Sequence, residues 1–105
     1  MKAIRYIIKD NDYKCGFLSA LDEYFDTDTI FNLSWIFEDK LKCPVIDMNN
    51  TISYFTVRGN RAFHKAIKKC ELAYKNIGIE FIRDEKDILD EDILYQDEYQ
   101  IICKY

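Results

Sequence analysis

The amino-acid sequence predicts a single α+β domain in which helices cover one face of an antiparallel sheet. Residues 60–77 repeat apolar side chains every three or four positions, which indicates a helix. Residues 3–9 and 52–57 are instead rich in β-branched and aromatic side chains, with alternation that indicates strands. The chain has 105 residues, of which 49% are hydrophobic, so we expect one domain over residues 1–105 with one sizeable core.

The helix expected at 60–77 has signals at both ends as well as a periodic interior. Asn60 can accept backbone N–H bonds as an N-cap, and Gly78 can adopt the left-handed conformation that ends a helix. Ile79 then folds back to make the apolar contact that often accompanies such an ending. The face that we expect to pack on the sheet consists of Phe63, Ala66, Ile67, Cys70, Ala73, Tyr74 and Ile77.

The remaining elements follow from shorter patterns. Turn residues at 10–12 and 48–51 separate the apolar segments, and an acidic connector occupies 84–92. In chain order we expect a strand at 3–9, a helix at 15–25, a strand at 52–57, the helix at 60–77, and strands at 79–83 and 98–105.

Residues 29–41 fit two different periods. As a helix, they place on one face Ile30, Leu33, Phe37 and Leu41. As a strand, they place on one face Phe31, Leu33, Trp35 and Phe37. We favour the strand because aromatic and β-branched residues are enriched here, and Pro44 ends any regular element soon afterwards.

The choice at 29–41 decides the expected topology. With a strand, the order is β-α-β-β-α-β plus a final strand, which is typical of a ferredoxin-like two-layer sandwich. With a helix, the order is β-α-α-β-α-β, and the chain then resembles barstar-type inhibitors in element order and aromatic content.

Composition indicates where the protein resides. No apolar run is long enough to span a membrane, and the first residues are too charged for a signal peptide, so we expect a soluble, cytoplasmic protein. In such a compartment cysteines are normally reduced. We therefore expect buried free thiols at Cys15, Cys43, Cys70 and Cys103.

No pattern in the chain predicts catalysis. His64 is the only histidine, and no nucleophile or orienting carboxylate is spaced to work with it. Neither a C-x-x-C pair nor a calcium-loop pattern is present, and Gly59 alone does not make a phosphate-binding loop. We expect no enzyme activity, no cofactor and no metal site.

Charge is strongly segregated along the chain, although the net charge is only −4. Residues 22–39 contain six acidic residues and no basic one, and residues 80–98 contain nine acidic residues against Arg83 and Lys86. Residues 58–75 contain six basic residues against Glu71. An acidic protein is a poor general ligand for nucleic acid, yet one basic face is still available.

The acidic segments are the first candidate for a binding site. Carboxylates on a rigid scaffold can attract a basic partner and occupy the places where phosphates would bind. Aromatic residues beside them are typical of interface anchors. The predicted protein-binding residues are Asp84, Glu85, Asp87, Asp90, Glu91, Asp92 and Tyr95, and the 22–39 segment is expected to join them in one negative surface.

The basic face of the 60–77 helix is the alternative site. Lysine and arginine side chains on one helix face can neutralise phosphates, which would make the protein a small nucleic-acid-binding or regulatory module. The residues predicted for this role are Arg58, Arg61, Lys65, Lys68 and Lys69.

Small size, acidity, aromatic content and the lack of catalytic motifs together suggest a class of protein. In these respects the chain resembles the small inhibitors of phages and mobile elements, including anti-CRISPR proteins. The resemblance implies a non-enzymatic protein that binds and blocks a basic nucleic-acid-processing enzyme, in the host cytosol if the gene belongs to a phage.

Overall fold

The computed structural model describes residues 1–105 and contains four α-helices, one short 3₁₀ helix and six strands. Helices and strands follow one another through the whole chain, with the longest irregular segment at 41–50. The elements are β1 (Lys2–Asp10), β2 (Tyr13–Gly16), α1 (Leu21–Tyr24), α2 (Thr27–Lys40), β3 (Thr51–Phe55), α3 (Val57–Ala62), α4 (His64–Asn76), β4 (Glu80–Asp87), η1 (Asp90–Asp92), β5 (Ile93–Gln96) and β6 (Gln100–Lys104).

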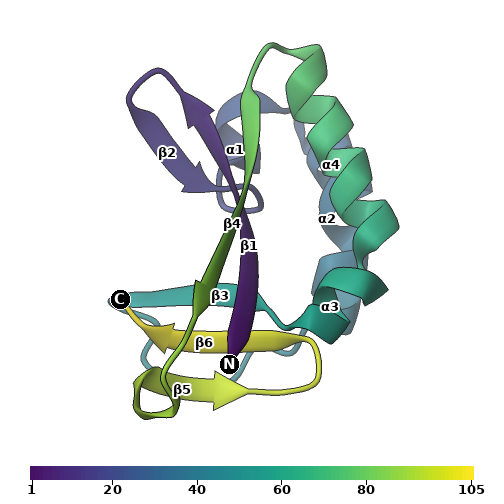
Figure 1. Ribbon diagram of the computed structural model, residues 1–105. Helices are drawn as coiled ribbons and strands as arrows, with labels where there is room; N and C mark the ends of the chain where they lie inside the picture. Colours follow the sequence, from purple (N-terminus) through teal and green to yellow (C-terminus); the bar gives the residue numbers. More distant parts are fainter.

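All six strands belong to one sheet, in which every pairing is antiparallel. β1 pairs with β4 over eight residues, whereas on its other side it pairs with β2 and, at the single position Ile4–Phe55, with β3. β3 continues the sheet to β6 and β5. Because β1 and β3 meet at one position only, β3 and β6 run across the direction of β1 and β4 (Figure 1).

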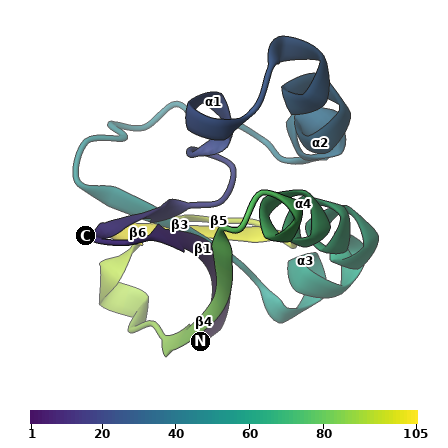
Figure 2. The same cartoon turned by 90° about the horizontal axis from the view of Figure 1, so that it is seen from above.

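The helices α2, α3 and α4 stand together beside β1 and β4 (Figure 1). Seen from above, α1 and α2 lie on one side of the strands, and the segment from β4 through η1 curls away on the other side (Figure 2). The predicted α+β class, with helices packed on an antiparallel sheet, is therefore confirmed.

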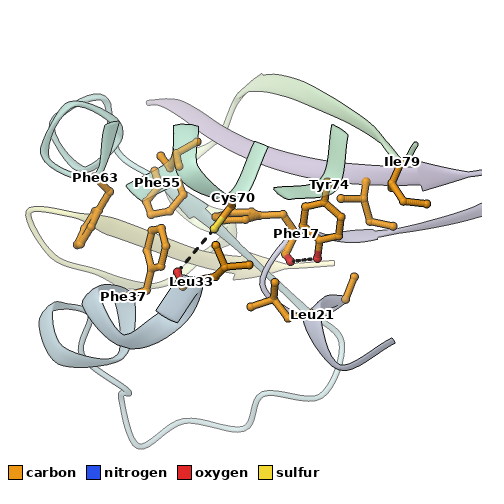
Figure 3. Packing of buried hydrophobic residues seen from close by; sticks show 12 residues of the cluster. Phe17, Leu21, Leu33, Phe37, Phe55, Phe63, Cys70, Tyr74 and Ile79 are labelled. Carbon is orange, nitrogen blue, oxygen red and sulfur yellow. Dashed lines mark hydrogen bonds between the residues drawn. The ribbon is translucent and has the colours of Figure 1, made fainter. Parts of the chain in front are cut away.

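The main core lies between the helices and the sheet and is rich in aromatic rings (Figure 3). Phe37 of α2 packs on Phe55 of β3 and on Phe63, with ring centroids 6.1 and 5.3 Å apart. The buried Tyr74 hydroxyl donates a 2.6 Å hydrogen bond to the Phe17 carbonyl, so its polar atom has a partner inside the core. Each large side chain buried here contributes about 1.5–3 kcal/mol to folding.

A second, smaller core lies on the opposite face of the sheet. It contains Ala3, Tyr54, Ile88, Ile101 and Cys103. Alternate residues of a strand face opposite sides of the sheet. Ile101 and Cys103 of β6 therefore enter this core, while Ile102 between them is buried on the other side. Ile88, directly after β4, packs into this core, and the segment from β4 onwards curls around this side of the sheet (Figure 2).

The strand expected at 29–41 is wrong, because Thr27–Lys40 forms helix α2. Asp26 caps the helix by accepting a 2.8 Å hydrogen bond from the Thr29 amide. Leu33 and Phe37 are buried in the main core. Ile30 and Leu41 share a face with them only if the segment is a helix, and both pack against the same core. The aromatic content favoured a strand, but packing against the core overrides that weak preference. The ferredoxin-like order is therefore not adopted, and two helices separate the N-terminal hairpin from β3, as in the β-α-α-β-α-β alternative.

The helix expected at 15–25 is reduced to α1 at its C-terminal end. The chain reverses at Asn11, whose φ of 56° is in the left-handed region, and residues 13–16 pair with β1 as strand β2. Cys15 consequently lies opposite Ile8 in the sheet rather than on a helix.

The helix expected at 60–77 is divided into α3 and α4 at Phe63. Its first cap is not Asn60 but Thr56, whose hydroxyl accepts a 2.9 Å bond from Gly59 and donates a 2.6 Å bond to the Glu98 carbonyl. Only glycine fits at position 59, because the backbone of Tyr99 lies against it and a Cβ there would collide with the Tyr99 carbonyl.

The predicted end of this helix is confirmed. Gly78 has a φ of 80°, and the amides of Gly78 and Ile79 bond back to the carbonyls of Lys75 and Tyr74 at 3.0 Å each. The strands expected at 3–9, 52–57, 79–83 and 98–105 are present, with β4 extending to Asp87. The connector expected at 84–92 accordingly begins within β4, and β5 was not predicted.

Candidate functional site

Three of the predicted protein-binding carboxylates lie on β4, and each has a basic partner. Asp84 accepts a 3.1 Å bond from Nε of Arg5, which lies directly opposite on β1. Glu85 is held by Arg83 at 2.6 Å and Lys2 at 3.5 Å, and the hydrogen bond from Arg83 is the main cause of its lowered pKa. Asp87 lies 3.5 Å from the N-terminal amine. These three charges are therefore partly neutralised within the protein.

The other three acidic residues of that prediction, Asp90, Glu91 and Asp92, form the turn of η1 and have no ion pair. Tyr95 on β5 is half-buried, and its hydroxyl donates a 2.7 Å bond to Asp97, which raises the pKa of the tyrosine. Its polar end is thus already engaged, which makes it a weaker interface anchor than the sequence suggests.

The two acidic segments do not form one surface, contrary to the expectation from the sequence. η1 lies on the side of the sheet to which β4 curls, whereas α1 and α2 lie on the other side (Figure 2). They must be considered as separate candidates.

The outer face of α2 combines free carboxylates with exposed aromatic side chains. Phe31 is 65% exposed and Trp35 is 47% exposed, although both are large apolar residues. Asp28, Phe31, Trp35 and Asp39 follow one another at intervals of three or four residues, which places them along one line on the helix. We define the α2 acidic surface as this line together with the other exposed acidic residues of α2 and of the preceding helix α1: Asp22, Glu23, Asp28, Phe31, Trp35, Glu38 and Asp39.

Few basic groups approach the α2 acidic surface. Its only ion pair is the 3.7 Å contact between Asp39 and the adjacent Lys40. Asp26, at the start of α2, is used as the helix cap, and the hydrogen bonds from Thr29 lower its pKa. Asp22, Glu23, Asp28 and Glu38 have no cation within ion-pair distance.

The sequence had contained the signal for this surface, but the strand interpretation concealed it. Asp26 followed by Thr29 is an N-cap pattern, and it begins a helical apolar repeat through Leu33 and Phe37. With a helix assigned there, Phe31 and Trp35 fall on the face opposite to that repeat and become visible as exposed aromatics.

The basic residues of the alternative site lie along α3 and α4, but most have partners. Arg58 pairs with Glu98 at 3.4 Å and Lys68 with Glu71 at 3.1 Å. Lys69 donates a 3.1 Å bond to the Asn32 carbonyl of α2. Arg61 and Lys65 are exposed and form no ion pair, so they are the two free cations of the predicted set. His64 is exposed at the first position of α4.

The four cysteines occupy different environments. Cys70 and Cys103 are buried, as expected, whereas Cys15 is half-buried and Cys43 is exposed. Burial raises the pKa of Cys70 to about 12, and its thiol lies 3.6 Å from the Leu33 carbonyl. No three side chains among the histidine, cysteine, aspartate and glutamate residues are grouped as a metal would require.

None of the helices combines the length and the apolar character needed to cross a membrane. The chain matches no protein-family model, no curated protein and no solved structure.

Proposed function

We propose that this protein is a non-enzymatic inhibitor that binds a basic protein surface through the α2 acidic surface. The observation that carries the proposal is the exposure of Phe31 and Trp35 on a face of α2 that also carries Asp28 and Glu38, two carboxylates without an internal ion pair. Interface hot spots are enriched in aromatic residues, tryptophan above all, that become buried at the centre of the contact.

The charges around the two aromatic residues favour a basic partner. Carboxylates without internal partners attract cations from a distance and accelerate association. The three carboxylates of β4 are less suited to this role, because Arg5, Arg83, Lys2 and the N-terminal amine already neutralise part of their charge.

A nucleic-acid-processing enzyme fits this description of a partner. Such enzymes carry lysine and arginine at the positions where phosphates bind. A protein that covers those positions with carboxylates excludes the nucleic acid and blocks the enzyme. This is the mode of action that the resemblance to anti-CRISPR proteins and other small phage inhibitors implies.

Affinity capture from the native host tests the proposal with three matched baits. The first is the wild-type chain, the second carries Phe31→Ala and Trp35→Ala, and the third carries Asp84→Asn, Glu85→Gln and Asp87→Asn. We expect the wild-type and third baits to retain one basic protein, identified by mass spectrometry, and the second to lose it. Removal of two hot-spot side chains weakens binding by about 2 kcal/mol or more each.

The purified partner then decides whether binding inhibits it. A stoichiometric amount of the wild-type protein should abolish nucleic-acid binding or cleavage by the partner, and the Phe31/Trp35 variant should not. Retention of the partner by all three baits contradicts the proposal. So does direct binding of this protein to DNA or RNA in a low-salt gel shift that Arg61→Ala and Lys65→Ala remove, since that result supports the nucleic-acid-binding alternative.

A further inference from the structure

A groove lies where the sheet divides between β2 and β3. Both strands pair with the same edge of β1, β2 at residues 7–10 and β3 only at Ile4, so they diverge from each other (Figure 1). The space beside them has a volume of about 450 Å³. Its mainly apolar wall includes Phe17, Leu18, Leu41, Met48 and Tyr54. This volume is within the range of ligand-binding pockets.

One edge of β3 faces this groove with free backbone groups. Tyr105 donates its amide to the Asn50 carbonyl at 2.8 Å, and Thr56 donates to the Tyr99 carbonyl at 3.0 Å. In an antiparallel ladder the hydrogen-bonded residues alternate, so the even-numbered positions from 50 to 56 bond to the β6 side. Thr51 and Ser53 therefore direct their N–H and C=O groups to the other edge, where no strand pairs with them.

Arg5 is the one charged side chain among the residues that line the groove. Its Nε bonds to Asp84 at 3.1 Å, and its guanidinium lies 5.5 Å from the centre of the Tyr54 ring. The structure contains no hydrogen bond from its two Nη atoms, which are free to donate to another carboxylate. No acidic side chain lines the groove itself, although Asp84 partly offsets the charge of Arg5 from beside it.

We infer that this groove binds an extended, acidic peptide segment of a partner protein, added as a strand to the free edge of β3. An unpaired strand edge is satisfied best by another peptide backbone, and an adjacent apolar wall accommodates every second side chain of such a peptide. A carboxylate of the peptide pairs with Arg5. This site is distinct from the α2 acidic surface. The groove prefers acidic ligands, whereas the α2 acidic surface prefers basic ones.

A phage-displayed library of random dodecapeptides, selected on the immobilised full-length protein, provides the probe. The enriched peptides are synthesised and their affinities measured by calorimetry. We expect sequences with alternating apolar residues and at least one Asp or Glu. On binding, the amides of Thr51 and Ser53 should become protected from hydrogen exchange, whereas those of Ile52 and Tyr54 are protected already.

Two substitutions at Ser53 separate backbone pairing from other contacts. Ser53→Pro removes the outward N–H without removing a bond to β6, a position where a sheet tolerates proline. It should weaken the affinity for the peptide about tenfold or more, while Ser53→Ala should leave the affinity unchanged.

A third variant, Ser19→Asp, changes an exposed residue in the groove wall. It should also weaken the affinity for an acidic peptide, and it keeps the test valid if the proline variant does not fold.

Three results would overturn the inference. These are peptides that bind the Ser53→Pro and Ser19→Asp variants as tightly as the wild type, peptides whose binding is lost in the Phe31→Ala/Trp35→Ala variant instead, and the absence of any enriched peptide.

Discussion

The carboxylates of β4 and those around α2 both come from acidic segments, but their electrostatic states differ. On β4, Asp84, Glu85 and Asp87 face basic groups of β1 and of β4 itself, at 2.6–3.5 Å. Around α2, most of the carboxylates have no cation within reach, and two exposed aromatic rings lie among them. A cluster of acidic residues in a sequence therefore does not by itself identify a negative surface.

Secondary structure explains the difference. Cross-strand neighbours in a sheet lie about 5 Å apart, so a strand rich in Asp and Glu is most stable beside one that carries Lys and Arg. The register of β1 and β4 places Arg5 opposite Asp84, and it brings Lys2 within 3.5 Å of Glu85. The outer face of a helix at the edge of a domain has no such neighbour, and its charges face solvent.

The largest effect that we expect distinguishes the two faces of α2. Phe37→Ala removes a ring that contacts Phe17, Phe55 and Phe63 in the main core and should lower the free energy of unfolding by about 3–5 kcal/mol. Trp35→Ala on the outer face should change it by no more than about 0.5 kcal/mol. Urea denaturation of both variants measures this, and a comparable loss in Trp35→Ala would place the tryptophan in the core and remove it from the binding site.

Acid and salt together should separate a helix cap from an ion pair. The pKa values of Asp26 and Glu85 are both lowered in the folded protein, by hydrogen bonds from Thr29 and Arg83 respectively. Each carboxylate thus stabilises the protein above its ordinary pKa of about 4, and this contribution is lost as pH falls through the lowered value. The melting-temperature differences of Asp26→Ala and Glu85→Gln from the wild type should therefore shrink in acid.

At pH 7, about 1 M NaCl should reduce the effect of Glu85→Gln and leave most of that of Asp26→Ala, because screening acts on the exposed ion pair. Asp26→Asn, which keeps a capping oxygen without titrating, is the control for the cap. An Asp26→Ala effect that vanishes in salt would show that charge, rather than capping, is what Asp26 supplies.

The smallest effect concerns the pair between β1 and β4. A double-mutant cycle with Arg5→Ala and Asp84→Ala should give a coupling energy of about 0.2–1 kcal/mol, since both side chains are partly exposed. Equilibrium unfolding of the four proteins measures it. A coupling near zero would mean that Asp84 is electrostatically as free as the carboxylates of α2, and the contrast between the two regions would disappear.

Local patterns predicted most of the strands and one helix end. The alternation at 3–9 and the Gly78 ending depend on neighbouring residues only, and both are confirmed. The interruption at Phe63 and the capping role of Thr56 were missed, because each depends on groups that are distant in the chain, such as Tyr99 and the Glu98 carbonyl. For the candidate site, the acidic 22–39 segment was visible in the sequence, but the exposure of its aromatic residues depended on the helix assignment.

The sequence by itself determined the α+β class, the segregation of charge and the candidate residues, since these depend on composition and short-range periodicity. Only the tertiary structure decided that 29–41 is a helix, because its two periods differ little in local preference and the burial of Leu33 and Phe37 selects one of them. Likewise, only the pairing of β1 with β4 brought Arg5 to Asp84 and Lys2 to Glu85, because an ion pair between distant residues depends on distance in space rather than on order in the chain.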